Sequence, residues 1–367
     1  MPVNYVYTPI VKGKANDFKA VANLTSGARA AIKPLIELLP VPAESSIDPH
    51  LIKFADNIAN HLPSGEIFVD FYGLLPGDVT RDGANAVATG FHMLVDRGRV
   101  VTPAYGFDRD DAVWTQLRSV VKRMNCGFCF RIDIDDLDDQ AEDTWSEIIE
   151  RASELKIVPA QADLLIDLRD IRQMDTAKLK GLVVDFLSLK PPGDAYRSII
   201  LAGSSALKTV ADIPKDGVGE ISQRELRLWM QLQSDLAGST ELTYADYGIV
   251  HPEFSDAGPN KNANAKIRYT KGAKFVIFRG HKLYDPSDFK QYHVLADRVR
   301  SSNQYEGRKF SFGDRYIDDC ASYILGPGNL GNWVLADMNH HLEYTTKQVA
   351  NLLQKVTSDL SEDEIEE

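Results

Sequence analysis

The sequence predicts a closed barrel of eight parallel strands with alternating helices, the (β/α)8 or TIM-like fold. Short β-branched or apolar runs alternate with amphipathic helical patterns over the first two thirds of the chain. The runs recur at roughly 30–40 residues, a spacing typical of β-α-β units and a parallel sheet. Eight such runs match a barrel, whose usual size is about 250 residues. An open, doubly wound sheet is the alternative.

Each expected element follows from its local pattern. Strands are predicted at 5–12, 32–39, 66–72, 99–106, 127–134, 163–169, 197–204 and 243–250. Helices are predicted at 48–61, 110–124, 141–155, 176–188 and 220–237, where apolar positions recur at helical spacing. The stretch "KIRYTKGAKFVIFRG" (266–280) alternates on both sides of "KGA", which predicts a β-hairpin. Further helices are predicted at 286–302, 314–325 and 338–356.

These elements predict one barrel domain over residues 1–358. An insertion after the eighth strand of a barrel lies beside its C-terminal mouth, so the hairpin region 261–282 is expected to cover that mouth. The last nine residues, "DLSEDEIEE", contain six acids and no base. Such a run is typical of a solvated tail, and 359–367 is predicted to be disordered.

Composition is that of a globular protein, with 44% hydrophobic and 26% charged residues in 367. No apolar run approaches the roughly 20 residues of a membrane helix, so no membrane association is expected. The N-terminus lacks the features of a secretory signal, and three cysteines cannot form a disulfide framework. We therefore expect a cytoplasmic protein. The net charge of −12 argues against a broad nucleic-acid surface but leaves room for a local basic pocket.

Strand alternation places polar residues on the inner face of the predicted barrel. In "FRIDI" (130–134) the apolar residues face the helices, which turns Arg131 and Asp133 inward. The same reasoning applied to the other strands selects Lys12, Glu37, Asp70, Asp108, Asp167, Ser204 and Asp246. All of them lie near the C-terminal ends of their strands, and in a barrel those ends converge on one mouth.

This ring contains two cations and six carboxylates, a formal charge of −4. Carboxylates held close together repel one another and must be relieved by cations, protons or a ligand. Oxygen ligands suit Mg2+ or another divalent cation, and a raised carboxyl pKa suits general acid catalysis. The predicted metal ligands are Glu37, Asp70 and Asp167, and the predicted catalytic residues are these three and Asp133. The alternatives are structural ion-pair networks, helix caps or a wrong strand register.

The hairpin contains the one basic patch of this acidic chain. Lys271 and Arg279 lie in it among other basic residues, with aromatic residues interleaved. A functional interpretation is an anionic ligand or a nucleic-acid strand held over the mouth. The alternative is a solvated hairpin whose lysines block the sheet edge.

Three other motifs are weaker. "CGFC" (126–129) lies on a predicted strand without a second cysteine pair, which favours buried structural cysteines. In "NHHLEY" (339–344) the neighbouring His340 and His341 cannot share a helix face, which favours a structural role. "AGSS" (202–205) could expose backbone N–H groups to a phosphate.

The chain resembles the phage beta-protein family. The motifs that carry the resemblance are "YTPIVKGKANDFKAVANL", "IKPLIELLP", "GFDRDDA", "FRIDIDDL", "LLIDLRDI" and "GNWVLADMNHHLEY". The resemblance implies one continuous domain and a place in phages, prophages or phage–host conflict, and it supplies no established catalytic residues. Its motifs contain Lys12, Lys14, Glu37, Asp108, Arg131, Asp133 and Asp167.

The sequence thus leads to two hypotheses of function. The first is a metal-assisted hydrolase of a phosphate-bearing substrate, such as a nucleotide or nucleic acid, in phage–host conflict. Its predicted substrate-binding residues are Lys12, Lys14, Asp108, Arg131, Ser204, Asp246, Lys271 and Arg279. The second is a non-enzymatic interaction protein that binds a protein partner in a phage defence or counter-defence system, because a fold alone does not establish catalysis.

Overall fold

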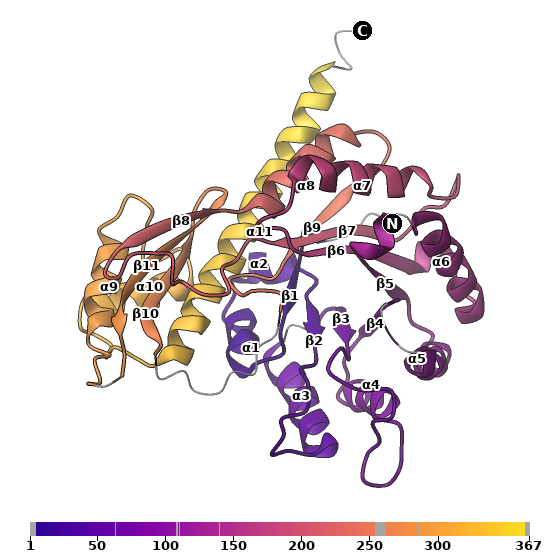
Figure 1. The fold of residues 1–367 in the computed structure, drawn as a ribbon, viewed down its shortest axis with the longest axis horizontal. Coiled ribbons are helices and arrows are strands. Elements are labelled where there is room, and N and C mark those ends of the chain that lie inside the picture. The colour runs from indigo at the N-terminus through magenta and orange to yellow at the C-terminus, as the bar shows by residue number, and fades with distance from the viewer. Residues whose placement is uncertain are drawn as a thin grey trace. The chain divides into compact units, whose positions relative to one another are not determined.

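The computed structural model describes residues 5–62, 64–107, 109, 111–138, 140–253, 262–284 and 286–363. It contains a closed barrel of eight parallel strands in the order β1-β2-β3-β4-β5-β6-β7-β9, drawn in Figure 1. The strands are β1 (Tyr7–Val11), β2 (Leu35–Glu37), β3 (Ile67–Asp70), β4 (Val101–Gly106), β5 (Phe128–Asp133), β6 (Ala162–Asp170), β7 (Ser198–Ser204) and β9 (Leu242–Asp246). The predicted (β/α)8 fold is confirmed.

The strand register brings the polar ends of neighbouring strands to the same level. Glu37 pairs with Asp70, and Asp133 pairs with Asp167. Val11 pairs with Ile36, so the next residues along each strand, Lys12 and Glu37, also lie side by side. Parallel strands end on the same side of the sheet, and these residues therefore surround one mouth of the barrel.

Helices follow the barrel strands, and the sequence patterns predict all of them except α4. They are α3 (Ile47–His61), α4 (Ala86–Asp96), α5 (Asp111–Met124), α6 (Ala141–Leu155), α7 (Thr176–Ser188) and α8 (Arg224–Asp235). In α6, acidic residues occupy the first turn, and the buried Trp145 and Ile148 face the core. In α7, the side chain of Asp175 accepts hydrogen bonds from two backbone N–H groups of the first turn.

The predicted helix 220–237 was wrong at its start. Residues 218–222 form β8 (Val218–Ser222), and α8 begins at Arg224. Every residue of "VGEIS" is exposed or partly exposed, so the stretch has no strong local strand pattern. Its strand is fixed instead by pairing with β11. No helix was predicted for the residues that form α4.

The chain divides into two compact units. The barrel unit comprises residues 1–14, 32–203 and 225–246, and the second unit comprises 15–31, 204–224 and 247–367. The second unit contains a three-stranded antiparallel sheet in the order β10-β11-β8, with β10 (Asn264–Thr270) and β11 (Lys274–Lys282). The predicted hairpin is therefore present. Its position over the mouth, and the interpretation of residues 1–358 as one domain, stay predictions.

Helices surround the core of the second unit. They are α1 (Ala15–Ala22), α2 (Ser26–Ala30), α9 (Gln291–Arg300), α10 (Phe312–Ala321) and α11 (Leu330–Asp363). One face of the sheet contributes buried residues to a cluster with α9, α10 and Trp333 of α11, and Trp333 stacks on Tyr292 at 4.6 Å. Helix α11 extends into the range 359–367 that was predicted to be disordered, and 364–367 lie outside the described residues.

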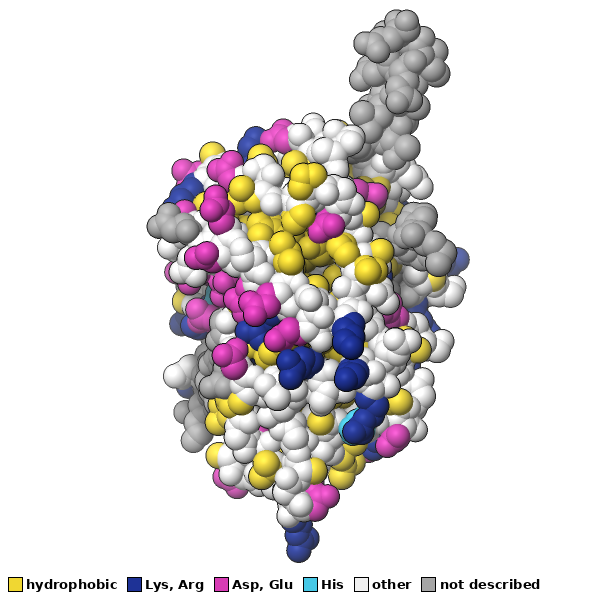
Figure 2. Space-filling view, turned by 90° about the vertical axis from the view of Figure 1, so that its right-hand side faces the viewer, with side chains coloured by type: hydrophobic (Ala, Val, Ile, Leu, Met, Phe, Trp, Pro, Cys, Tyr) yellow, Lys and Arg dark blue, Asp and Glu magenta, His cyan; other side chains and the backbone are white. Residues whose placement is uncertain are grey.

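Within the described residues, no helix is long and apolar enough to cross a membrane. On the face shown in Figure 2, basic, acidic and hydrophobic side chains lie close to one another. This mixture differs from the continuous basic surface of a protein that binds along nucleic acid. Burial raises the pKa of Cys126 to about 11 and also raises that of Cys129 well above its ordinary value, as expected of structural cysteines.

Candidate functional site

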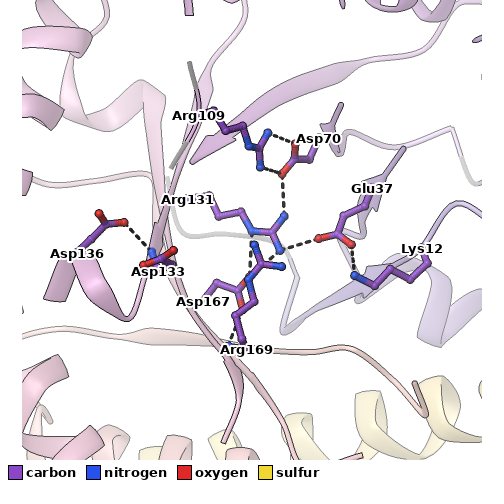
Figure 3. A network of polar contacts seen from close by, with 9 residues as sticks. All are labelled: Lys12, Glu37, Asp70, Arg109, Arg131, Asp133, Asp136, Asp167 and Arg169. Atoms are coloured by element: carbon purple, nitrogen blue, oxygen red, sulfur yellow. Dashed lines mark hydrogen bonds and ion pairs between the residues drawn. The ribbon is translucent and has the colours of Figure 1, made fainter. Parts of the chain in front are cut away.

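A buried guanidinium group joins three carboxylates at the barrel mouth. Arg131 lies on β5 with 2% of its surface exposed. Its Nη1 lies 2.7 Å from Oδ2 of Asp70, and its Nη2 lies 2.6 Å from both Oδ2 of Asp167 and Oε1 of Glu37. Figure 3 shows these residues converging from three other strands on Arg131. Side chains far apart in sequence are thus connected in one layer of charged groups.

Three further cations surround this centre (Figure 3). Lys12 Nζ donates to Oε2 of Glu37 at 2.5 Å. Arg109 binds Asp70 through both terminal nitrogens, with 2.7 Å between Nη2 and Oδ2. Arg169 Nε lies 3.3 Å from Oδ2 of Asp167. Each of the three carboxylates therefore has at least two cationic neighbours.

The charge of the site differs from the expectation. Lys12, Arg109, Arg131 and Arg169 outnumber Glu37, Asp70 and Asp167, which gives a formal charge of one positive unit. The predicted value of −4 referred to a larger ring, which also counted Asp108, Asp133 and Asp246 and did not include Arg109 or Arg169. A buried cluster with an excess of cations attracts an anion rather than a further cation.

The pKa shifts agree with this balance. Burial raises the pKa of Asp70, but the guanidinium groups of Arg109 and Arg131 outweigh burial and hold it below its ordinary value. Asp70 consequently stays ionised and anchors both arginines. Burial lowers the pKa of Lys12 and outweighs the opposing influence of Glu37. A lysine with a lowered pKa gives up its proton more readily than an exposed one.

Sequence reasoning could have found Arg169 but not Arg109. Arg169 lies two residues after Asp167 on the same strand, so alternation places both on the same face. Its backbone has a φ of +55°, a left-handed conformation that is uncommon outside glycine. Arg109 follows β4 by three residues, in a segment without the two-residue period of a strand. No local pattern indicates which way such a side chain points.

Gly13 fixes the chain where β1 leaves the barrel. Its φ is +61°, and a Cβ atom there would lie 2.7 Å from the carbonyl oxygen of Glu37. Gly13→Ala is therefore expected to lower the free energy of unfolding by about 2 kcal/mol or more and to displace Lys12. Urea unfolding measures the loss. Gly83→Ala is the matched control, because Gly83 has a φ of +80° and open space around its Cβ position. Equal losses in the two variants would contradict the close contact with Glu37.

Two of the predicted inward residues lie outside the Arg131 network. The Asp133 carboxylate accepts a hydrogen bond from the backbone N–H of Asp135 at 2.8 Å, as part of the loop after β5. Asp246 is buried and accepts hydrogen bonds from the hydroxyl groups of Tyr7 at 2.5 Å and Tyr244 at 3.0 Å. Both contacts fit structural roles.

The remaining predicted ligands have separate positions. Lys14 is an exposed residue just after β1. Ser204, the last residue of β7, accepts a hydrogen bond from the backbone N–H of Ala206 at 3.1 Å. In the second unit, Lys271 pairs with Glu306, and Arg279 donates to the backbone carbonyl groups of three residues before β8. Asp108 lies outside the described residues.

The predicted metal ligands all contact cations. Glu37, Asp70 and Asp167 each lie against Arg131, and among the described residues no group of three or more His, Cys, Asp or Glu side chains is arranged to hold a metal ion. In this arrangement the three carboxylates do not fit a divalent cation without releasing Arg131. Binding of Mg2+ stays a prediction.

A cavity of about 350 Å³ opens at the opposite ends of β7 and β9. Arg197, which lines it, binds Asp163 and lies 3.1 Å from Glu66, so its charge is neutralised within the barrel. Barrel enzymes place their chemistry at the C-terminal ends of the strands. We therefore assign the candidate site to the mouth around Arg131 rather than to this cavity.

Several solved structures are similar to the chain at low identity. An alanine racemase from Clostridium difficile 630 in complex with cycloserine is 12% identical, with a TM-score of 0.34 over 74% of this chain, which spans 61% of that one. Triosephosphate isomerase from Bartonella henselae is 11% identical, with a TM-score of 0.34 over 66% of this chain and 92% of that one. The N-terminal domain of a putative aldolase from Bacteroides vulgatus is 10% identical, with a TM-score of 0.34 over 95% of this chain and 99% of that one.

Similarities of this size carry no argument about activity. A search of curated proteins found no match. The model of one protein family, by contrast, matches residues 7–347 and so spans both units described above. That family is described as "Beta protein", and the chain belongs to it.

Proposed function

We propose that the barrel mouth binds a phosphate-bearing substrate and hydrolyses it. One observation carries the proposal: four cations and three carboxylates form a single connected layer at the C-terminal ends of the strands. Oriented guanidinium groups bind phosphate strongly because two N–H groups of one plane match two phosphate oxygens. A cytoplasmic location, expected from the sequence, is part of this proposal.

The residues differ in their proposed roles. Asp70 and Asp167 are positioning residues that orient arginines. Arg169 keeps 27% of its side chain exposed and meets the phosphate first. Lys12, whose pKa is lowered by burial, donates a proton to the leaving group, and Glu37 accepts one from the attacking water. Asp70, with its lowered pKa, is a poor proton donor and serves as an anchor.

Arg169→Gln tests the binding role. Loss of one charged hydrogen bond is expected to weaken phosphate binding by about ten- to a hundredfold. The measurement is the dissociation constant of inorganic phosphate, by calorimetry at fixed ionic strength. Arg97→Gln is the matched control, because Arg97 is 28% exposed and also forms an ion pair through Nε, with Asp56. If both variants bind phosphate like the parent protein, Arg169 has no part in anion binding.

Hydrolysis is tested separately with p-nitrophenyl phosphate and bis(p-nitrophenyl) phosphate. Glu37→Gln removes the proposed base, and Asp167→Asn loosens the arginines that Asp167 orients, so both are expected to lower the rate by about a hundredfold or more. Unchanged rates in both variants would rule out the proposed chemistry. Phosphate binding without hydrolysis of either phosphoester would support a phosphate-binding protein and contradict an enzyme of this class.

Assistance by a divalent ion is the finer part of the prediction. An ion held by Glu37, Asp70 and Asp167 would compete with the guanidinium group of Arg131 for the same oxygens. Arg131→Met is then expected to increase the thermal shift that Mg2+ produces. The absence of any Mg2+-dependent shift in either protein would remove the metal from the proposal.

The alternative function, an interaction protein of a phage defence or counter-defence system, stays a prediction. It requires a stoichiometric protein partner that is lost when residues 261–282 are deleted. It also requires that the same partner remains when Arg169 is neutralised. Retention of the partner after the deletion would count against the hairpin as the binding surface.

A further inference from the structure

An exposed aromatic ring lies close to two of the arginines of the mouth. Tyr72 follows the last residue of β3 by two positions, and 40% of its surface is exposed. The guanidinium carbon of Arg109 lies 5.2 Å from the centre of its ring, and that of Arg169 lies 5.4 Å from it. The sequence prediction did not select Tyr72, because it looked for polar residues on the inner faces of strands, and Tyr72 is an aromatic residue beyond a strand end.

Buried carboxylates hold both arginines in place. Arg109 binds the buried Asp70 through two nitrogens, and Arg169 lies against the buried Asp167. Their positions beside the ring therefore do not depend on Tyr72 alone. Fixed guanidinium groups beside an aromatic face provide adjacent sites for an anion and for a planar group.

The exposure of the ring indicates how it could be used. A tyrosine that served only to support two arginines could be covered by them, yet more than a third of Tyr72 is exposed. Planar bases stack on such rings with little dependence on base identity. The overall charge of −12 favours a small ligand over a nucleic-acid strand.

We propose that the ligand of the mouth combines a planar unsaturated ring with an anionic group, as a mononucleotide does, with the ring on Tyr72 and the anion on Arg169. This inference rests on the proposed function, because it uses the same phosphate site. It goes further in assigning the substrate class and the residue that recognises its ring. The ring and the phosphate then contribute separately to binding, and each can be removed from the ligand.

The test compares five probes by calorimetry at fixed salt: AMP, UMP, ribose 5-phosphate, adenosine and inorganic phosphate. AMP is expected to bind about tenfold or more tightly than ribose 5-phosphate, and UMP within a few-fold of AMP. Tyr72→Leu is expected to abolish the difference between AMP and ribose 5-phosphate, and Tyr72→Phe to keep it. Tyr284→Leu is the control, because Tyr284 is 37% exposed and lies in the second unit.

Other outcomes separate the inference from the proposed function. Equal binding of AMP, ribose 5-phosphate and phosphate, unchanged in Tyr72→Leu, overturns the inference and leaves phosphate binding intact. Adenosine that binds as tightly as AMP, and is lost in Tyr72→Leu, supports the ring site and overturns the phosphate site. A single-stranded oligonucleotide that binds far more tightly than AMP overturns the assignment to a mononucleotide.

Discussion

Replacing Arg131 by methionine is expected to lower the free energy of unfolding by about 3–5 kcal/mol. Methionine fills much of the same volume but leaves Glu37, Asp70 and Asp167 without their shared guanidinium group. Buried carboxylates that lose a partner become costly, since they are held apart from water. Urea unfolding of the parent and variant measures the difference. The loss of stability is expected in the barrel unit, and hydrogen exchange measures whether it occurs there.

The pH dependence of this loss provides a second readout. The pKa of Asp70 lies below its ordinary value in the folded protein. Its contribution to stability is therefore present above the unfolded pKa of about 3.9 and is lost as the pH falls through the lower folded pKa. The deficit of Arg131→Met is accordingly expected to shrink below about pH 4, where protonated carboxyl groups no longer need a cation.

Arg118→Met is the control for Arg131→Met. Arg118 is exposed on α5 and lies 3.5 Å from Glu154, so its loss is expected to change stability by no more than about 0.5 kcal/mol. Similar effects for the two variants would contradict the central place of Arg131. A deficit that is constant from pH 7 to pH 3 would contradict its electrostatic origin.

In the second unit, His340→Leu is expected to cost about 3–5 kcal/mol. His340 is buried on α11, with Nδ1 2.8 Å from Oδ2 of Asp314 and Nε2 2.9 Å from the carbonyl oxygen of Thr270. Both ring nitrogens of His340 therefore have a buried hydrogen-bond partner. The ring also stacks on Tyr269 at 3.7 Å. Leucine removes both contacts and leaves a buried carboxylate with hydroxyl partners alone.

Replacing both His340 and Asp314 tests whether the cost of His340→Leu comes from the buried carboxylate. The double variant His340→Leu, Asp314→Asn is expected to be more stable than His340→Leu, because it no longer buries an uncompensated charge. His50→Leu is the control, since His50 is partly exposed and has one hydrogen bond, to the carbonyl oxygen of Leu39. A double variant less stable than the single one would show that the buried charge is not the cause.

Strong periodicity made the barrel predictable from the sequence. All eight strands coincide with β-branched or apolar runs, and the helices α3, α5, α6 and α7 begin and end within one residue of their predicted bounds. The strand β8 was missed because its residues are partly exposed and its structure depends on pairing with β11. Pairing between segments far apart in sequence leaves little local signal.

The candidate site was predictable in part for the same reason. Alternation placed Lys12, Glu37, Asp70, Arg131 and Asp167 on one inner surface, and the structure connects these five through Arg131. Two arginines of the layer were not predicted, because Arg109 extends from a loop, where no period applies, and Arg169 lies at the end of a strand with a left-handed backbone. Asp133 and Asp246 bind local partners instead of Arg131. Strand alternation predicts which face a residue occupies, and side-chain reach decides what it binds.

A crystal structure of the protein soaked in tungstate tests the central claim most directly. Tungstate has the shape and charge of phosphate, and its metal atom is located without ambiguity by anomalous scattering. We expect one anomalous peak at the mouth, with oxygen atoms within hydrogen-bonding distance of Arg169 and with Arg131 still bound to Glu37, Asp70 and Asp167. A fully occupied peak elsewhere and none at the mouth would contradict the account.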